Sequence, residues 1–342
     1  GVSAGQRYGL SARGLAIDVG ESGGEEFPVF RAFWIERPAA EAVGIVVHAA
    51  LDSRRIAGAY TFRIYPGEVL TMDVTATLFP RSELRHVGIA PLTSMFLHGP
   101  IDPARRADYR PRVHDSEAVG IATATGERLW RPVQNPATLQ FSTFVSDGPP
   151  EGFGLLQRTR DFDGYQDLEA RYDQRPSAWV RPDGDAWPAG AVTLVEIPTP
   201  GEINDNVVAY YRLAAPLVPG RAAEFAYRLT WPDSRRGDTQ AIVVRTARGL
   251  KLGDDARREI VIDYALRETV DDLAGFVAGI TLETGAPDAL RLRARAEPHP
   301  LLPGFRVVLD FVEPPRGVAE LRVRPMREGE AAGETWLYRI VP

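Results

Sequence analysis

The 342 residues include 46 acidic and 40 basic side chains, which gives a formal net charge of -6. Hydrophobic residues make up 44% and charged residues 25%, a composition that is typical of a folded globular chain and excludes a disordered one. The lack of cysteine excludes disulfides, thiolate zinc sites, iron–sulfur clusters and cysteine nucleophiles, and the acidic balance gives no reason to expect nucleic acid or an anionic membrane as the main partner.

Alternation of apolar and polar residues with a period of two predicts β-strands along most of the chain. The clearest case is a hairpin of residues 59–65 and 69–79, joined by a turn at Pro66-Gly67. Helical patterns are short and confined to residues 92–97 and 271–277. No long amphipathic helix separates the strands, as a parallel βαβ architecture would require, so a mostly antiparallel β protein is predicted. Further strands are expected at residues 33–37, 44–51, 139–145, 192–197, 207–213 and 223–231.

A polar break at residues 232–238 divides the chain. Beyond the break, short strands separated by turns are typical of a small immunoglobulin-like sandwich. We therefore predict a main β domain at residues 1–231, a linker at 232–238 and an immunoglobulin-like domain at 239–342. The strands expected in this last part are residues 241–245, 259–264, 289–296, 305–312, 319–324 and 335–340.

Nucleotide, metal and serine-hydrolase motifs are missing from the sequence. It contains no P-loop, no Rossmann glycine fingerprint, no H-E-x-x-H pair and no G-x-S-x-G elbow, so no metal site or cofactor is predicted. Neither a run of about 18 apolar residues nor a signal-peptide pattern is found, which is expected of a cytoplasmic protein, a mature form or a fragment.

Carboxylate chemistry and aromatic surfaces for carbohydrate remain. Asp115 follows a histidine in a loop, and Asp205 lies between two asparagines directly before a strand. Paired carboxylates, one acid and one base, are what cleavage of a glycosidic bond needs. The alternative is structural, because Asp at a strand start commonly makes an Asx turn. Aromatic residues near arginine, such as Trp34, Tyr172 and Trp179, suit stacking on sugar rings but equally suit core packing.

Long ordered blocks of sequence are more specific. They include G-Q-R-Y-G-L-S-A-R-G-L at residues 5–15, F-W-I-E-R-P at 33–38, A-P-L-T-S-M-F-L at 90–97, Y-R-P at 109–111, H-D-S at 114–116, R-Y-D at 171–173, R-P-S-A-W-V at 175–180 and N-D-N at 204–206. These blocks resemble the periplasmic glucans biosynthesis family, OpgG/OpgD (also called MdoG/MdoD). They span about residues 5–231, and the likeness is weaker in the C-terminal part, where it rests mainly on E-T-W at 334–336.

The resemblance implies an all-β fold: a large antiparallel β-sandwich of the mutarotase-like carbohydrate type, followed by a small immunoglobulin-like sandwich. It implies a periplasmic protein without cofactors that acts on the β-1,2-glucan backbone of osmoregulated periplasmic glucans. The first expectation is an inverting endo-β-1,2-glucanase in which Asp205, as general acid, passes its proton through a substrate hydroxyl. Asp115 would assist the base side through water. Substrate-binding residues expected from these blocks are Tyr8, Arg13, Trp34, Arg110, Tyr172 and Trp179.

Other readings of the same resemblance stay open. They are an inverting cyclising transglycosylase on the same glucan, and a non-catalytic glucan-binding partner of the inner-membrane glucosyltransferase; a mutarotase-like epimerase ranks last, because only fold analogy favours it. A homodimer is also expected. Family members carry further residues and sandwich strands before the first block, so we expect open sheet edges in this chain. The loop at residues 232–238 looks short for a glucanase, which leaves hydrolysis or transglycosylation undecided.

Overall fold

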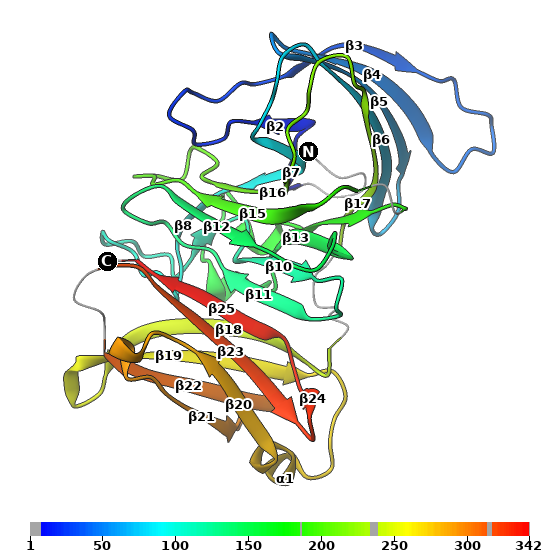
Figure 1. Cartoon of the computed structure of the whole chain (residues 1–342). Helices are drawn as coiled ribbons and strands as arrows, with labels where there is room; N and C mark the ends of the chain where they lie inside the picture. The colour runs from blue at the N-terminus through cyan, green and yellow to red at the C-terminus, as the bar shows by residue number, and fades with distance from the viewer. Residues whose placement is uncertain (1–7, 185–186, 233–238, 313–316, 342) are drawn as a thin grey trace.

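The computed structural model describes residues 8–184, 187–232, 239–312 and 317–341. The described chain is almost entirely β, with one short α-helix and three 3-10 turns (Figure 1). The prediction of an all-β fold is therefore confirmed. No helix of the described residues is long and apolar enough to cross a membrane.

Two large sheets build the main part of the molecule. The smaller has six strands in the order β1-β7-β16-β15-β12, with β2 paired to β7. Its strands are β1 Ser11–Ala12, β2 Leu15–Ile17, β7 Val87–Ser94, β12 Gln140–Phe144, β15 Gly190–Glu196 and β16 Val207–Leu213. A two-stranded sheet pairs β8 Phe96–His98 with β9 Val113–His114 directly after β7.

The larger sheet has 13 strands and runs from the C-terminal part of the chain to its N-terminal hairpins. Its order is β20-β23-β25-β11-β10-β13-β14-β17-β6-β5-β4-β3, with β24 paired to β23. Its strands are β3 Val29–Ile35, β4 Ile45–Asp52, β5 Ile56–Tyr65, β6 Leu70–Pro80, β10 Ala118–Ala122, β11 Arg128–Pro132, β13 Gly152–Leu156, β14 Ala178–Pro182, β17 Ala223–Trp231, β20 Ile280–Gly285, β23 Ala319–Arg327, β24 Glu330–Ala331 and β25 Thr335–Ile340.

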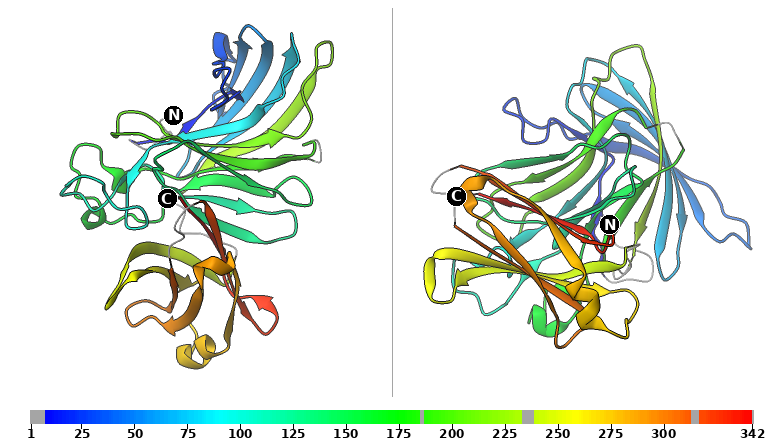
Figure 2. Two further views of the ribbon diagram at one scale, coloured as in Figure 1. Left: turned by 60° about the vertical axis from the view of Figure 1, so that its left-hand side comes forward. Right: turned by 60° about the horizontal axis from the view of Figure 1, so that its bottom comes forward.

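One hydrophobic core lies between these sheets. It joins residues of the smaller sheet, such as Leu92 and Tyr211, to residues of the larger sheet, such as Val74 and Phe153. Burying both inner faces in one core is the arrangement of a β-sandwich. In the views of Figures 1 and 2, the blue hairpins β3 to β6 lie at one end of the molecule and the C-terminal strands, yellow to red, lie at the other.

The C-terminal strands form two sheets. One is β18-β19-β22-β21, made of β18 Ala241–Lys251, β19 Asp254–Leu266, β22 Gly304–Val312 and β21 Arg293–Pro298. The other, β20-β23-β25, continues into the main sheet through the parallel pairing of β25 with β11, where Trp336 lies opposite Trp130. Most of the expected linker falls outside the described residues, so the domain boundary and the immunoglobulin-like and mutarotase-like assignments stay predictions.

Strands with one polar face were predicted well. The expected hairpin is β5–β6, with Tyr60 opposite Ala76, and the expected bounds of β16, β17 and β25 match the structure. Strands β10 and β13 were missed. Every residue in them is buried, and a strand buried on both faces shows no alternation.

The two helix predictions had opposite outcomes. The helix expected at residues 271–277 is α1 Leu273–Ala278, whose first turn is capped by the Asp272 carboxylate accepting from the Gly275 amide at 2.8 Å. The helix expected at residues 92–97 was wrong, because this stretch ends β7 and begins β8. Pairing of Leu92 with Ala209 of β16 overrides the weak local helical pattern. The strand expected at residues 289–296 was partly wrong, since a 3-10 turn, η3 Asp288–Leu290, precedes β21.

Candidate active site

Both predicted aspartates are hydrogen-bonded to the junction between β7 and β8, residues 93–96. Asp205 lies two residues before the start of β16, and the Thr93 hydroxyl donates to its Oδ2 at 2.7 Å. The backbone amide of Asp115 donates to the carbonyl of Met95 at 2.8 Å. Two residues that are 90 positions apart in sequence are thus fixed by one short stretch of chain.

Asn206 locks this junction in place. Its side-chain carbonyl accepts from the Phe96 amide at 2.8 Å, and its amide group donates to the carbonyls of Phe96 and Ile197, both at 3.0 Å. The side chain is almost fully buried, so these bonds satisfy backbone groups that have no access to water. The second asparagine of the N-D-N block is therefore a structural residue that positions its neighbour Asp205.

Asp205 lies at the open side of the site. Its side chain is 36% exposed, and besides Thr93 it has the Arg13 guanidinium at 3.4 Å. Arg13 is itself 58% exposed, so this ion pair adds little stability. The arrangement leaves the carboxyl reachable for a ligand while its direction is set by Thr93.

Asp115 is more deeply placed and faces Arg175, whose Nε lies 3.3 Å from its Oδ1. The Arg175 guanidinium lies between two rings, 5.0 Å from the centroid of Tyr8 and 5.7 Å from that of Tyr172, contacts that hold a cation in place. The pKa of Asp115 is raised to about 6. Burial is the main cause, the charges of Asp205 and Glu202 act in the same direction, and the charge of Arg175 opposes them. The two aspartates are therefore electrostatically coupled.

His114, the neighbour of Asp115, is a core residue. Its ring is stacked on Phe96 with the centroids 5.3 Å apart, and its Nδ1 lies 2.8 Å from Oε1 of Gln157. Burial, and next the nearby charge of Arg112, lower its pKa to about 3, so the ring is neutral at ordinary pH. It supports the loop of Asp115 and carries no charge.

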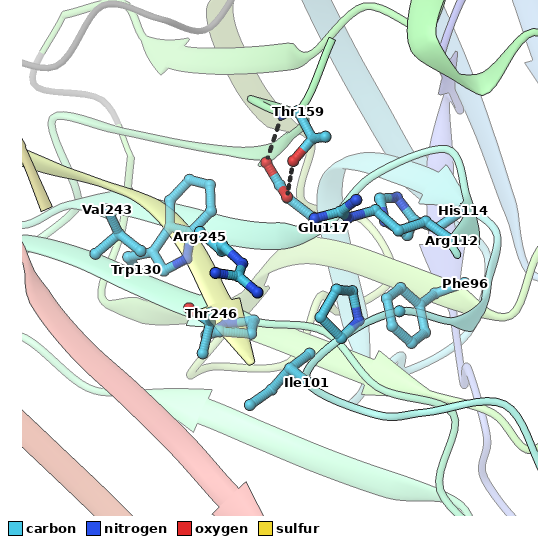
Figure 3. A pocket seen from close by; sticks show the side chains of 13 residues that line it. Phe96, Ile101, Arg112, His114, Glu117, Trp130, Thr159, Val243, Arg245 and Thr246 are labelled. Carbon is cyan, nitrogen blue, oxygen red and sulfur yellow. Dashed lines mark hydrogen bonds between the residues drawn. The ribbon is translucent and has the colours of Figure 1, made fainter. Parts of the chain in front are cut away.

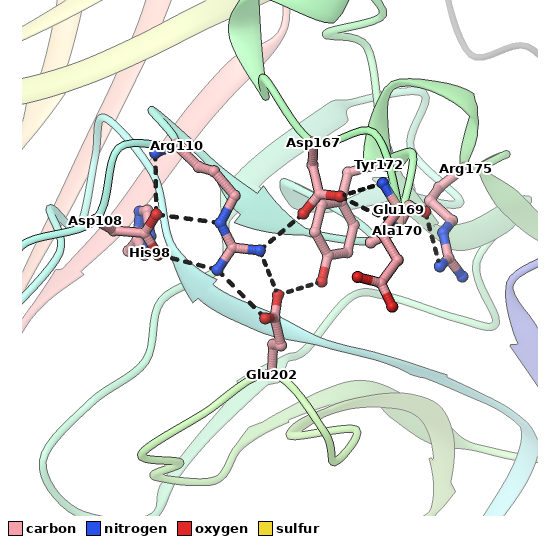
Figure 4. Close-up of polar contacts among 9 residues, drawn as sticks. All are labelled: His98, Asp108, Arg110, Asp167, Glu169, Ala170, Tyr172, Arg175 and Glu202. Atoms are coloured by element: carbon pink, nitrogen blue, oxygen red, sulfur yellow. Dashed lines mark hydrogen bonds and ion pairs between the residues drawn. The ribbon is translucent and has the colours of Figure 1, made fainter.

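Arg110 lies at the centre of a carboxylate cluster (Figure 4). Its Nε donates to Asp108 at 3.1 Å, Nη2 to Asp108 and Glu202 at 3.0 and 3.3 Å, and Nη1 to Asp167 and Glu202, both at 2.8 Å. These bonds occupy all five N–H donors of the guanidinium. In this state Arg110 arranges acidic side chains, and whether it also contacts substrate stays untested.

Tyr172 connects this cluster to the aspartates. Its hydroxyl donates to Glu202 Oε2 at 2.7 Å (Figure 4), and its ring faces Arg175. Gln157 donates from its side chain to the Tyr172 carbonyl at 2.6 Å, which fixes the short turn that carries the tyrosine. Three of the predicted ligand residues, Tyr8, Arg13 and Tyr172, thus lie around Asp115 and Asp205, and the fourth, Arg110, is connected to them through Glu202 and Tyr172.

The two predicted tryptophans lie elsewhere. Trp34 is 57% exposed on β3, the edge strand of the larger sheet. Trp179 on β14 packs over glycines of β13, where a Cβ added at Gly152 would fall 2.6 Å from its Nε1. Within the described parts of the chain, neither tryptophan has a hydrogen bond or ring contact with the residues around the aspartates, and their predicted role in binding stays untested.

A cavity lies where the main sheets meet the C-terminal strands (Figure 3). Its lining includes His114, Trp130, Arg245 and Glu117, whose carboxylate accepts from the Thr159 amide and hydroxyl at 3.1 and 3.0 Å. The volume of about 20 Å³ has room for about one water molecule. It is therefore too small for a sugar and belongs to the packing between the two parts.

Sequence reasoning missed Thr93, Arg175 and Glu202 as members of the site. All three stand in or beside sequence blocks that carried the family resemblance, but nothing local in those blocks shows which residue faces an aspartate. Among the described residues, no group of three side chains is arranged to hold a metal ion.

Comparison with known families and proteins gives the family. The model of the periplasmic glucan biosynthesis protein MdoG matches residues 1–340. The chain belongs to the MdoG family. The resemblance inferred from the sequence blocks is thereby confirmed.

Similar curated proteins share nearly half of their aligned residues with this family member. Glucans biosynthesis protein G 2 of Shewanella oneidensis is 46% identical over 339 residues, covering 99% of this chain and 62% of the relative. Glucans biosynthesis protein G of Rhodopseudomonas palustris is 46% identical over 344 residues, covering 100% and 67%, and that of Vibrio cholerae is 46% identical over 347 residues, covering 98% and 61%. The chain thus spans about three fifths to two thirds of the length of these relatives.

Proposed function

We propose that this protein acts in the periplasm on a β-1,2-linked glucan, as an inverting endo-glucanase that uses Asp205 and Asp115. The observation that carries the proposal is that one short stretch, residues 93–96, holds both aspartates, Asp205 by its carboxyl and Asp115 by its backbone amide, with the charge of Asp205 raising the pKa of Asp115. Two carboxyls on either side of a glycosidic bond can supply the acid and the base that inversion needs. Membership of a family described as one of periplasmic glucan biosynthesis supports the substrate class and the compartment.

In this scheme Asp115 is the base. A pKa of about 6 leaves the carboxyl ionised at neutral pH and more basic than an ordinary aspartate, which suits proton abstraction. Asp115 takes a proton from a water, directly or through a second water, and that water forms the new bond to the anomeric carbon. The bond from that carbon to the leaving oxygen breaks.

Asp205 is the acid. Its proton passes through a substrate hydroxyl to the leaving oxygen, so that one proton is taken up and one is given in each turnover. Thr93 fixes the direction of the carboxyl, and its exposed side is open to the glucan. Tyr8, Arg13 and Tyr172 are in place to contact sugar hydroxyls or ring faces around the two aspartates.

The test is incubation of the protein with linear β-1,2-glucan, followed by a reducing-end assay and mass spectrometry. New reducing ends are expected, and they should vanish in Asp205→Asn, because the amide is nearly isosteric but has no acidic proton. Asp147→Asn, which makes the same charge change at an exposed loop, is the matched control and should keep full activity. Full activity in Asp205→Asn would refute the assignment of the acid.

A second candidate function is a non-catalytic glucan-binding role in glucan synthesis, as a partner of the membrane glucosyltransferase. The names of the relatives, which speak of glucans biosynthesis, favour it. Unchanged glucan with measurable binding would support this candidate. Products lighter by one water, without new reducing ends, would instead indicate the cyclising transglycosylase.

A further inference from the structure

An open groove of about 610 Å³ lies beside the candidate active site. Two loops and one acidic residue line it: residues 107–110, residues 167–169, and Glu202. The Arg110 cluster of Figure 4 forms part of this lining. The groove is larger than the cavity of Figure 3 and more open to solvent.

Large apolar side chains at and beside this groove are highly exposed to solvent. Tyr109 is 79% exposed and Leu168 is 83% exposed, and Ile203, the neighbour of Glu202, is 94% exposed. Single exposed apolar residues are common, but two on the lining of one groove, with a third next in sequence to the lining residue Glu202, indicate a surface that binds a ligand. An exposed tyrosine ring offers a flat apolar face with a polar tip, which suits the apolar face of a sugar ring.

The floor of the groove presents acceptors in fixed directions. Asp108, Asp167 and Glu202 are all held by Arg110, and Asp167 also accepts from the amides of Glu169 and Ala170 at 2.9 and 2.7 Å. A carboxylate has about four lone-pair sites, so acceptor capacity remains for hydroxyl donors. With Glu169, four carboxylates and one guanidinium line the groove, and this excess of negative charge selects against an anionic ligand.

A series of side-chain contacts connects the groove to the two aspartates. Glu202 lines it and accepts from the hydroxyl of Tyr172, and the ring of Tyr172 contacts the Arg175 that pairs with Asp115. A chain that leaves the aspartates past Tyr172 and Glu202 therefore enters the groove.

We propose that this groove is a distal subsite that binds a glucose unit of a neutral, unsubstituted glucan chain, with Tyr109 as its stacking platform. The inference rests on the proposed function and adds where the glucan runs beyond the two aspartates. Its ligand is a hydroxyl-rich neutral sugar, recognised by ring stacking and by carboxylate acceptors.

Titration calorimetry on an Asp205→Asn background tests this subsite, because glucan is then not consumed. The ligands are a long linear β-1,2-glucan and the β-1,2-linked disaccharide of glucose, which leaves no unit for the groove when one unit lies on each side of the scissile bond at the aspartates. Tyr109→Ala should weaken binding of the long glucan about ten-fold, which corresponds to the loss of one stacking contact, and leave binding of the disaccharide unchanged. Phe27→Ala, at a side chain 73% exposed, is the matched control and should change neither.

The outcomes separate the subsite from the proposed function. Equal affinity of Tyr109→Ala and its parent for the long glucan overturns the subsite alone, and equal losses for both ligands overturn its distal placement. No binding of either glucan by the parent overturns the proposed function together with the subsite. Leu168→Ser, a second rim variant, should weaken the long glucan only, and a thermal unfolding curve for each variant confirms that it is folded.

Discussion

Replacing Asp115 by asparagine should stabilise the protein, and only at neutral and alkaline pH. Because burial raises the pKa of Asp115 to about 6 from an ordinary 3.8, the folded protein holds this proton more tightly than the unfolded chain. The difference, at about 1.4 kcal/mol per pH unit, means that the ionised carboxylate costs the fold about 3 kcal/mol above pH 6. The cost disappears below about pH 4, where the carboxyl is protonated in both states. Asparagine has nearly the same shape and no charge to bury.

The free energy of unfolding of the two proteins is to be measured by urea denaturation at pH 7.5 and at pH 4. The variant should exceed the parent by up to about 3 kcal/mol at pH 7.5 and match it at pH 4. Asp147→Asn, at an exposed position, should show no comparable gain at either pH. A difference that is the same at both pH values would refute the reasoning, because a packing effect of the amide does not depend on the protonation of Asp115. In the proposed mechanism, Asp115→Asn gains stability at the expense of activity.

Three further predictions concern the surroundings of the site. Arg175→Gln removes the charge that lowers the pKa of Asp115. The acidic limb of the plot of kcat/KM against pH should therefore move from near pH 6 to higher pH. An acidic limb at the same pH in the variant and the parent would contradict the role of Arg175. Asn206→Ala removes the side chain that hydrogen-bonds the backbone groups of Phe96 and Ile197. Urea denaturation should show a loss of about 3 kcal/mol in the free energy of unfolding, and kcat should fall because Asp205 is displaced. Wild-type stability of this variant would argue against the locking role of Asn206. Glu334→Ala removes the carboxylate that lies 2.7 Å from both Nη atoms of the buried Arg158. The Val243 carbonyl, which also accepts from Nη1, carries no charge to replace it, so the loss in the free energy of unfolding should be about 3–5 kcal/mol. Glu320→Ala, at an exposed glutamate paired with Arg339, should cost less than about 1 kcal/mol.

Sequence blocks predicted some residues of the candidate site and missed others. The H-D-S and N-D-N blocks named both aspartates, and the neighbouring blocks named Tyr8, Arg13 and Tyr172, which lie around them, and Arg110, which is connected to them through Glu202. The blocks could not show that Arg110 donates its hydrogen bonds to Asp108, Asp167 and Glu202, because these partners come from three separate loops. For the same reason Arg175 and Thr93 were missed, although both stood within quoted blocks.

By itself, the sequence determined the all-β class, the hairpin β5–β6, the short helix α1 and the family, because alternation, helical patterns and ordered blocks depend on residues that are neighbours in sequence. Only the tertiary structure decided the strands β10 and β13 and the strand at residues 92–94, since burial on both faces removes any local pattern. It also decided that Asp115 carries the raised pKa. That property depends on water excluded, and on charges brought near, by residues distant in sequence.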